Sequence, residues 1–461
     1  MFTSRYSQKK YNQKKPFWQR PLYILIGLPL SIIGLELLTR LVLSVAGKSA
    51  ELESYDGNTP IARAYNLRFE DDNKHPLDGL PAQGKLIAKR HLSLGYQLAP
   101  SQKNDYLQIN VQGFREDQGV DKNKPDDEIR IFVLGGSAAF GKMSLNNQTT
   151  FAHKLESRLN QRVQDQKKNP DRYRPFPLPV YYPEKVKALA LPPQIKPVKY
   201  RVINASVPGY ASGNELSRLA TEVLAYNPDI VIVVNGYADL ILPSKYQAAD
   251  IPEINTFLTD APGHFWTFIS RRTVNFIGQS YLIKTVNYWF IRPQKTIAQK
   301  TVGINDAKIT MAEFLTNNTG ELQKRVKRYE NNLLLMAKLT APNNIPLIIA
   351  VQPEITSRSV TSTQEKEILS QLGTTYQQRI KKGYTEIVKS TEQVKKDFGE
   401  NVTALNFYPL YDKFPGAAFQ DAIHLTDEAH TVLADQLFKN VIELDKLSIA
   451  KKKKPPSEDN N

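Results

Sequence analysis

The chain has 461 residues, 41% of them hydrophobic, no cysteine and a formal net charge of +15. The lack of cysteine excludes disulfides, thiolate metal sites and a cysteine nucleophile, and the scattered histidines lack the spacing of a helical metal site. Lysines at the two ends of the chain and in one insert supply much of the charge, without any nucleic-acid-binding motif, so we expect no nucleic-acid partner.

An apolar segment follows a basic N-terminus. Residues 1–20 contain lysine and arginine but no acidic residue, and residues 21–47 are apolar over a length that can cross a bilayer. The positive-inside rule predicts a cytoplasmic 1–20, a single transmembrane helix over 21–47, and an extracytoplasmic or periplasmic position for the rest. Within the helix, Glu36 and Arg40 lie one turn apart and can pair.

A cleaved signal peptide is the alternative interpretation of this segment. Residues 44–46, Ser-Val-Ala, resemble a small-x-small cleavage site. The apolar run is longer than an ordinary signal core, which favours a retained membrane anchor.

The remainder divides into a polar lead-in region, residues 48–128, and an α/β domain, residues 129–445. The lead-in contains short strand-like pieces such as Tyr106 to Val111. In the domain, apolar runs alternate with segments of helical periodicity. Such runs are typical of strands covered on both faces, so the alternation predicts a parallel sheet with helices on both sides. The runs are 129–135, 200–205, 229–236, 345–353 and 402–407, and the helical segments are 149–165, 212–226, 320–340 and 363–398.

Two inserts interrupt the domain. Residues 166–199 are rich in proline, lysine and tyrosine, which predicts an extended surface loop. Residues 243–318 include an aromatic and basic stretch, 264–290, which suits a lid, a surface that leans on the membrane, or a helical pair packed on the core. The basic tail, 446–461, is predicted to be disordered.

In parallel α/β sheets, active sites form at the carboxyl ends of the strands. The first run ends in Gly135-Gly136-Ser137, where a serine flanked by glycines can expose its hydroxyl at a helix N-terminus. The N–H groups there face a developing oxyanion. The alternative is an ordinary turn in which Ser137 caps the helix. The Gly-Lys-Ser/Thr ending of a phosphate loop is absent.

Further polar residues follow the other runs. Gly209, after the second run, is placed to present its N–H beside Ser137, or is simply a loop glycine. Near the end of the chain, Asp421 stands three residues before His424, and a helical pattern follows to about residue 442. An aspartate at this spacing can hold the imidazole in the tautomer that accepts a serine proton.

Together, these blocks resemble the SGNH (GDSL-like) hydrolase superfamily in order and strand context, over roughly residues 129 to 445. The stretch INVQGFR, 109–115, also resembles a lead-in of membrane-anchored bacterial members. The resemblance implies a three-layer α/β/α flavodoxin-like fold with a central parallel sheet. It further implies a triad of Ser137, Asp421 and His424, with the N–H groups of Ser137 and Gly209 as oxyanion donors.

The sequence departs from the family pattern at two positions. Gly136 stands where the family's name motif has aspartate, as is familiar among anchored members. Ala238 stands where the pattern Gly-x-Asn-Asp has the asparagine whose side chain donates to the oxyanion, and alanine has no such donor. Asn235 and Tyr237 are candidates to replace that donor or to bind substrate.

The resemblance implies a serine esterase or acylhydrolase that needs no metal or organic cofactor. An outward-facing anchored enzyme suits an envelope substrate, such as the O-acyl groups of a glycan or lipid. The same site would be an O-acyltransferase if a sugar hydroxyl replaced water. A further alternative is a low-activity or non-catalytic SGNH scaffold that binds glycan or a membrane complex; Ala238 favours it, and the retained Ser137, Asp421 and His424 oppose it.

Overall fold

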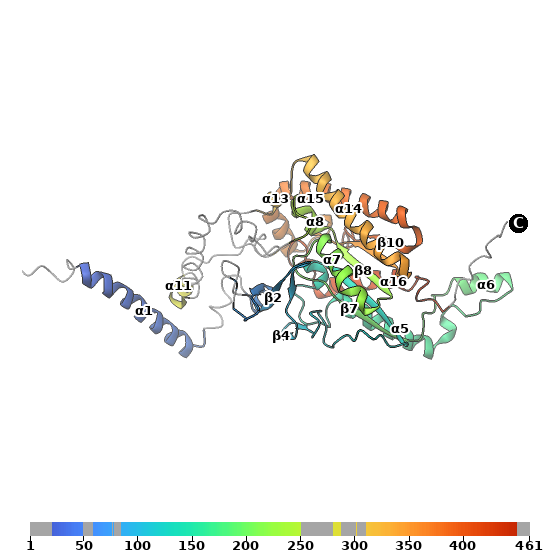
Figure 1. Cartoon of the computed structure of the whole chain (residues 1–461), viewed down its shortest axis with the longest axis horizontal. Helices are drawn as coiled ribbons and strands as arrows, with labels where there is room; N and C mark the ends of the chain where they lie inside the picture. Colours follow the sequence, from blue (N-terminus) through green and yellow to red (C-terminus); the bar gives the residue numbers. More distant parts are fainter. Residues whose placement is uncertain are drawn as a thin grey trace, which may run out of the picture. The chain divides into compact units, whose positions relative to one another are not determined.

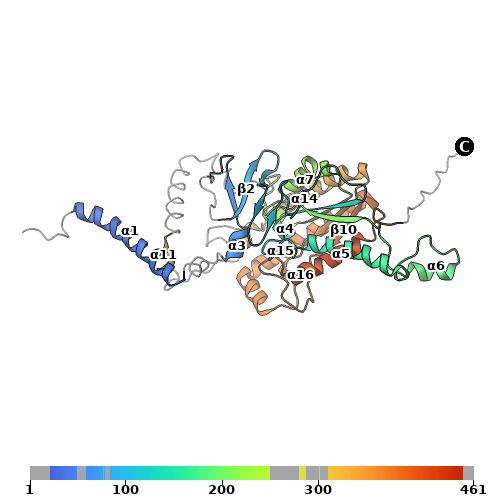
Figure 2. The same cartoon turned by 90° about the horizontal axis from the view of Figure 1, so that it is seen from below.

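The computed structural model describes residues 21–48, 59–75, 77, 84–249, 280–286, 301 and 310–449. The chain divides into two compact units, one of residues 1–59 and 266–294, the other of residues 60–265 and 295–461 (Figures 1 and 2). The predicted basic N-terminus, the end of the tail and most of the stretch 264–290 lie outside the described residues.

The first unit contains the apolar helix α1 (Pro21–Val45). Its residues 26–45 have a mean hydropathy of 1.8, so α1 is long and apolar enough to span a membrane or to serve as a signal sequence. The predicted pairing within it is confirmed, because Arg40 Nε donates to Glu36 Oε1 at 2.8 Å.

The charged pair of α1 also contacts a short helix from the second insert, α11 (Tyr281–Val286). Glu36 accepts hydrogen bonds from the Tyr281 backbone N–H at 2.9 Å and from Ser280 Oγ at 2.7 Å. The Arg40 guanidinium lies 5.0 Å from the centre of the Tyr281 ring. The pair therefore holds a segment that follows it by more than 200 residues.

A five-stranded parallel sheet forms the centre of the second unit. Its strand order is β7-β6-β8-β9-β10, and numbering these strands along the chain gives 2-1-3-4-5, the flavodoxin-like arrangement. Every residue of β6, β8 and β9 is buried, as the apolar runs predicted. The strands are β6 (Glu128–Gly135), β7 (Lys199–Asn204), β8 (Ile230–Asn235), β9 (Leu347–Val351) and β10 (Val402–Asn406).

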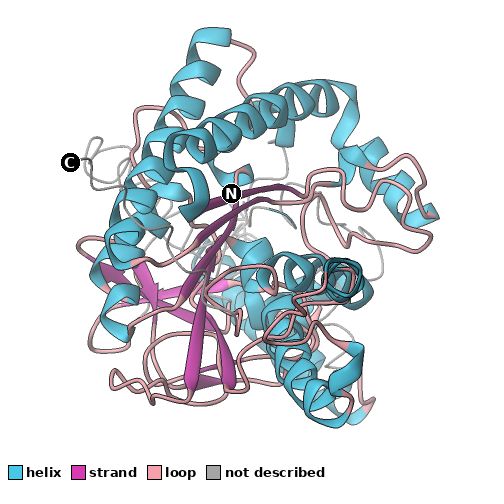
Figure 3. Cartoon of the chain, turned by 90° about the vertical axis from the view of Figure 1, so that its right-hand side faces the viewer, coloured by secondary structure: helices cyan, strands magenta, loops and turns pink. Residues whose placement is uncertain are grey.

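Helices cover both faces of this sheet, which confirms the predicted three layers (Figure 3). Helix α5 packs against α16, and α14 packs against both α7 and α15. Each lies where helical periodicity predicted it, and α15 breaks at Gly373, whose φ is +75°. These helices are α5 (Phe151–Lys168), α7 (Ser212–Thr221), α14 (Thr319–Thr340), α15 (Thr363–Phe398) and α16 (Asp427–Val441).

Shorter helices complete the unit. One of them, α6 (Tyr182–Leu189), lies in the insert for which we predicted only an extended loop, and Figures 1 and 2 show it away from the sheet. A proline near its start needs no N–H partner and favours helix initiation there. The others are α3 (Pro60–Tyr65), α4 (Ser137–Phe140), α8 (Tyr237–Ile241), α13 (Met311–Phe314), η2 (Pro170–Arg172), η3 (Val223–Tyr226), η5 (Ala341–Asn343), η6 (Ile355–Ser357) and η7 (Gly399–Asn401).

The lead-in region forms a small sheet of its own, in the order β1-β2-β3. Its apolar side chains share a buried cluster with Phe140, Val207 and Tyr210 of the α/β domain. The lead-in from residue 60 onward is therefore part of the same compact unit as the parallel sheet. Its strands are β1 (Leu67–Glu70), β2 (Leu86–His91) and β3 (Gly95–Leu98), with β4 (Gln102–Lys103) and β5 (Gln108–Ile109) as a separate antiparallel pair.

Candidate active site at the carboxyl ends of the strands

The turn between β6 and α4 presents Ser137 at the switch point of the sheet, where β6 lies between β7 and β8. A side chain at Gly136 has no room, because a Cβ there would lie 2.9 Å from the Tyr210 carbonyl oxygen. Close approach of the neighbouring loop thus explains the glycine at the position where the family's motif has aspartate. Ser137 itself is half-buried and opens α4.

Three predicted residues meet at this point, although 284 positions separate Ser137 from Asp421 in the sequence. Ser137 Oγ lies 2.8 Å from His424 Nε2. The opposite ring nitrogen, His424 Nδ1, lies 2.6 Å from Asp421 Oδ2. Serine, histidine and aspartate therefore form one continuous chain of hydrogen bonds.

Hydrogen bonds to backbone groups fix the loop that carries Asp421 and His424. Asp421 Oδ1 accepts the N–H groups of Ile423 at 3.0 Å and His424 at 2.9 Å, which leaves Oδ2 for the imidazole. The Ile355 N–H, beyond the end of β9, donates to the Ala422 carbonyl at 3.0 Å. The segment after β9 thus holds the turn in which the Asp421 carboxylate orients the His424 ring.

Burial and hydrogen bonding set the charges of the pair. Burial alone would raise the pKa of the Asp421 carboxyl, but the His424 ring and the two backbone N–H donors lower it to about 2. Burial lowers the pKa of His424 below its ordinary value, against the opposing effect of Asp421. At neutral pH the aspartate is therefore ionised and the imidazole neutral, so His424 can accept a proton from Ser137.

Two backbone N–H groups at the same end of the sheet have no acceptor among the residues that the structure describes. In the described parts of the chain, neither the Ser137 N–H nor the Gly209 N–H donates a hydrogen bond to another residue. The loop of Gly209 is joined to the serine turn, because the Val207 N–H donates to the Gly135 carbonyl at 3.0 Å. Gly209 is exposed and has a φ of +90°, a conformation that favours glycine.

The turn after β8 supplies no side-chain donor at position 238, because the residue there is alanine. Ala238 is a half-buried residue of α8. Asn235 is buried, and its amide donates to Glu215 and accepts from the Tyr329 hydroxyl at 3.0 Å. Both the NH₂ group and the oxygen of that amide are thus hydrogen-bonded to buried side chains.

The second candidate, Tyr237, is also hydrogen-bonded inside the protein. Its buried hydroxyl lies 3.2 Å from the Tyr376 hydroxyl, which in turn donates to Glu354 at 3.0 Å. Burial raises the pKa of the Glu354 carboxyl to about 7. The structure therefore places both candidates, Asn235 and Tyr237, in buried hydrogen-bond networks.

The lead-in region supports the serine turn through Arg115, a role that our reading of the sequence missed. Its Nη1 donates to the carbonyls of Phe140 at 2.8 Å and Gly141 at 2.7 Å, at the end of α4. Its Nε donates to Asn147 Oδ1 at 2.9 Å, and its Nη2 donates to the Tyr65 hydroxyl at 2.5 Å and to the carbonyl of residue 146 at 3.1 Å. All five donors of this buried guanidinium are used.

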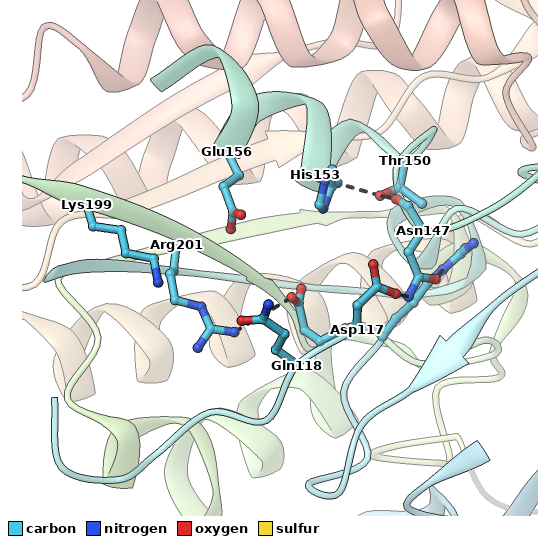
Figure 4. A pocket seen from close by; sticks show the side chains of 10 residues that line it. Asp117, Gln118, Asn147, Thr150, His153, Glu156, Lys199 and Arg201 are labelled. Atoms are coloured by element: carbon cyan, nitrogen blue, oxygen red, sulfur yellow. Dashed lines mark hydrogen bonds and ion pairs between the residues drawn. The ribbon is translucent and has the colours of Figure 1, made fainter. Parts of the chain in front are cut away.

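A polar cavity of about 210 Å³ lies beside the edge strand β7 (Figure 4). Its lining includes Glu116, Glu156 and Arg201. Ser137, Asp421 and His424 do not line it. Glu116 and Glu156 accept the outward-facing N–H groups of Asn204 at 3.0 Å and Val202 at 2.8 Å. These carboxylates therefore satisfy two backbone N–H groups on the outer side of the edge strand β7.

The likenesses found between this chain and known proteins are structural. No family model and no curated protein matches its sequence. The chain has a flavodoxin-like α/β/α fold. Solved structures with a detectable likeness include an acetyl xylan esterase, at 13% identity and a TM-score of 0.33, covering 68% of this chain and all of that one.

Two further structures show a similar degree of likeness. A lipase/acylhydrolase from Enterococcus faecalis has 14% identity and a TM-score of 0.34, covering 70% of this chain and all of that one. A GDSL-like lipase from Bacteroides thetaiotaomicron has 12% identity and a TM-score of 0.30, covering 70% of this chain and 92% of that one. Such likenesses assign no activity to this chain.

Proposed function

We propose that the chain is a serine ester hydrolase of the SGNH (GDSL-like) type, with Ser137, His424 and Asp421 as its catalytic triad. The observation that carries the proposal is the continuous hydrogen-bonded chain from Ser137 Oγ through the buried imidazole to an ionised carboxylate. Its place at the switch point of a flavodoxin-like sheet supports it further.

The reaction passes through a covalent acyl-enzyme. His424 takes the proton of Ser137 while the serine oxygen attacks the ester carbonyl. The N–H groups of Ser137 and Gly209 donate to the oxyanion, and Asp421 stabilises the imidazolium. The alcohol leaves with the proton from His424. Water then attacks the acyl group, with His424 as base, and releases the carboxylic acid and the free serine.

The proposed substrate class follows from the predicted position outside a membrane. An esterase anchored by α1 meets the envelope first, so the O-acyl groups of an envelope glycan or lipid are its proposed substrates. Transfer of the acyl group to a sugar hydroxyl uses the same site and the same first half of the reaction. Hydrolysis is the activity tested first, because water is always present as acceptor.

A direct assay uses the full-length protein in detergent micelles with p-nitrophenyl acetate and p-nitrophenyl butyrate. We expect steady hydrolysis of at least one of these esters, preceded by a burst of no more than one p-nitrophenolate per molecule if deacylation is slower than acylation. A folded protein that neither hydrolyses these esters nor transfers their acyl groups to an added sugar would refute the esterase proposal.

The proposed topology puts residues 1–20 in the cytoplasm and both the lead-in region and the catalytic domain outside. Because the chain has no cysteine, single cysteines report their position without background. A membrane-impermeant maleimide added to intact spheroplasts should label Leu92→Cys, whose side chain is fully exposed, and should leave Ser7→Cys unlabelled until the cells are lysed. The opposite pattern would contradict the topology.

The alanine at position 238 should limit the rate of the proposed reaction. Losing one oxyanion donor typically costs about 100- to 1,000-fold in kcat, so Ala238→Asn is expected to raise kcat for p-nitrophenyl acetate by at least about tenfold. Ala238→Asp is the matched control, because it has the same shape and no N–H donor. Equal effects of the two substitutions, or no increase with asparagine, would mean that position 238 does not face the oxyanion.

A further inference from the structure

One contact joins the lead-in region directly to the oxyanion loop. The Tyr96 hydroxyl, on β3, donates to the Pro208 carbonyl oxygen at 2.7 Å. Tyr96 is 3% exposed, and a Cβ at Gly209 would collide with its hydroxyl. The bond is therefore a buried contact made against the peptide that precedes Gly209.

The geometry of that peptide links the Tyr96 contact to the Gly209 N–H. The carbonyl of Pro208 and the N–H of Gly209 belong to one peptide unit, which is planar. In a trans unit the two groups point in opposite directions. A hydroxyl that fixes the direction of the carbonyl therefore also fixes the direction of the Gly209 N–H on the other side of the plane.

Tyr96 is itself held in place. Its ring packs edge-to-face against Phe69 and against Tyr210, with ring centres 5.4 Å apart in each case. The Tyr210 hydroxyl in turn donates to the Tyr96 backbone carbonyl. The two tyrosines thus tie β3 to the oxyanion loop in both directions, so the hydroxyl acts from a rigid position.

We propose that Tyr96 is a positioning residue for ester hydrolysis, which fixes the Gly209 N–H for the developing oxyanion. The proposal rests on the esterase function proposed above. It has added weight in this chain because Ala238 contributes no side-chain donor, so the backbone donors carry more of the oxyanion stabilisation. It also gives the lead-in region a part in the chemistry that the triad alone does not reveal.

Tyr96→Phe removes the hydroxyl and keeps the ring packing. Because the oxyanion forms only on the way to the transition state, we expect kcat for p-nitrophenyl acetate to fall by about 10- to 100-fold with KM changed by less than about threefold. Tyr200→Phe is the matched control. Its buried hydroxyl also donates to a backbone carbonyl, that of Lys196 at 3.0 Å, but at the amino end of β7. Tyr200→Phe should lower the thermal midpoint about as much as Tyr96→Phe does, and it should leave kcat unchanged.

Each outcome decides the matter. If the wild-type full-length protein neither hydrolyses an ester nor transfers its acyl group to an added sugar, the proposed function itself fails. If it is active and Tyr96→Phe lowers kcat no more than Tyr200→Phe does, the esterase stands and the positioning role is wrong. A 3-fluorotyrosine at position 96 keeps both the ring and the hydroxyl donor, so kcat should stay within about threefold of wild type. A loss as large as that expected of Tyr96→Phe would also overturn the role.

Discussion

Ser137→Ala is expected to lower kcat for p-nitrophenyl acetate by about a million-fold, the scale of removing a triad nucleophile. The substitution deletes the atom that forms the acyl-enzyme and leaves the free N–H groups of Ser137 and Gly209 in place. Any residual rate then comes from oxyanion stabilisation and binding alone. The measurement is the initial rate in detergent micelles at equal protein concentration.

The control for this variant is Ser390→Ala. Ser390 is a buried serine on α15, and its hydroxyl donates to Glu330 at 3.2 Å. Its replacement should leave kcat within about twofold, because Ser390 takes no part in the triad. An equal fall in both variants would point to a general loss of structure, and an unchanged rate in Ser137→Ala would remove Ser137 from the reaction.

Asp421→Asn should lower kcat by about 10,000-fold while the protein stays folded. The asparagine oxygen can still accept the N–H groups of Ile423 and His424, which now bond Asp421 Oδ1. Its NH₂ group would then face His424 Nδ1 and force the ring proton onto Nε2. In that tautomer the ring cannot accept the proton of Ser137.

The matched control is Asp412→Asn, because Asp412 Oδ1 likewise accepts a backbone N–H, that of Ser359 at 3.0 Å. Its replacement should change kcat by less than about twofold. Thermal midpoints of both variants separate lost activity from lost structure. A rate within tenfold of wild type in folded Asp421→Asn would mean that the aspartate does not set the tautomer.

The strands of the sheet could be predicted because their environment is simple. A strand buried on both faces has no polar face, so β6, β8 and β9 read as continuous apolar runs bounded by turn residues. The helices of the two outer layers have one apolar face each and show it as a period of three to four residues. The insert helix α6 was missed because it is nearly uncovered, with only Ala188 buried, and so has little apolar pattern.

The three residues of the proposed triad were predictable because the motifs around them resemble those of the SGNH hydrolases. Their hydrogen bonds were not, since they depend on where the Asp421 loop docks against Ile355. Whether Asn235 or Tyr237 could replace the missing donor stayed open at the sequence level for a similar reason. Position at a strand end does not say whether a side chain faces the site or the interior, and here buried partners hold both.

The contributions of Arg115 and Tyr96 were beyond reach from sequence. Arg115 belongs to the INVQGFR stretch, whose resemblance to a lead-in of membrane-anchored family members assigned no role to this arginine. Tyr96 carries no motif at all, and its contact with Pro208 spans 112 positions in the chain. Both act through backbone carbonyls, which every residue has, so no sequence pattern marks their partners.

The most direct test of the account is covalent labelling of the full-length protein with a fluorophosphonate, followed by peptide mapping by mass spectrometry. We expect one adduct per molecule, located on Ser137, and no adduct in Ser137→Ala or after unfolding. Labelling of another serine, or none in folded protein that hydrolyses esters, would contradict Ser137 as the nucleophile.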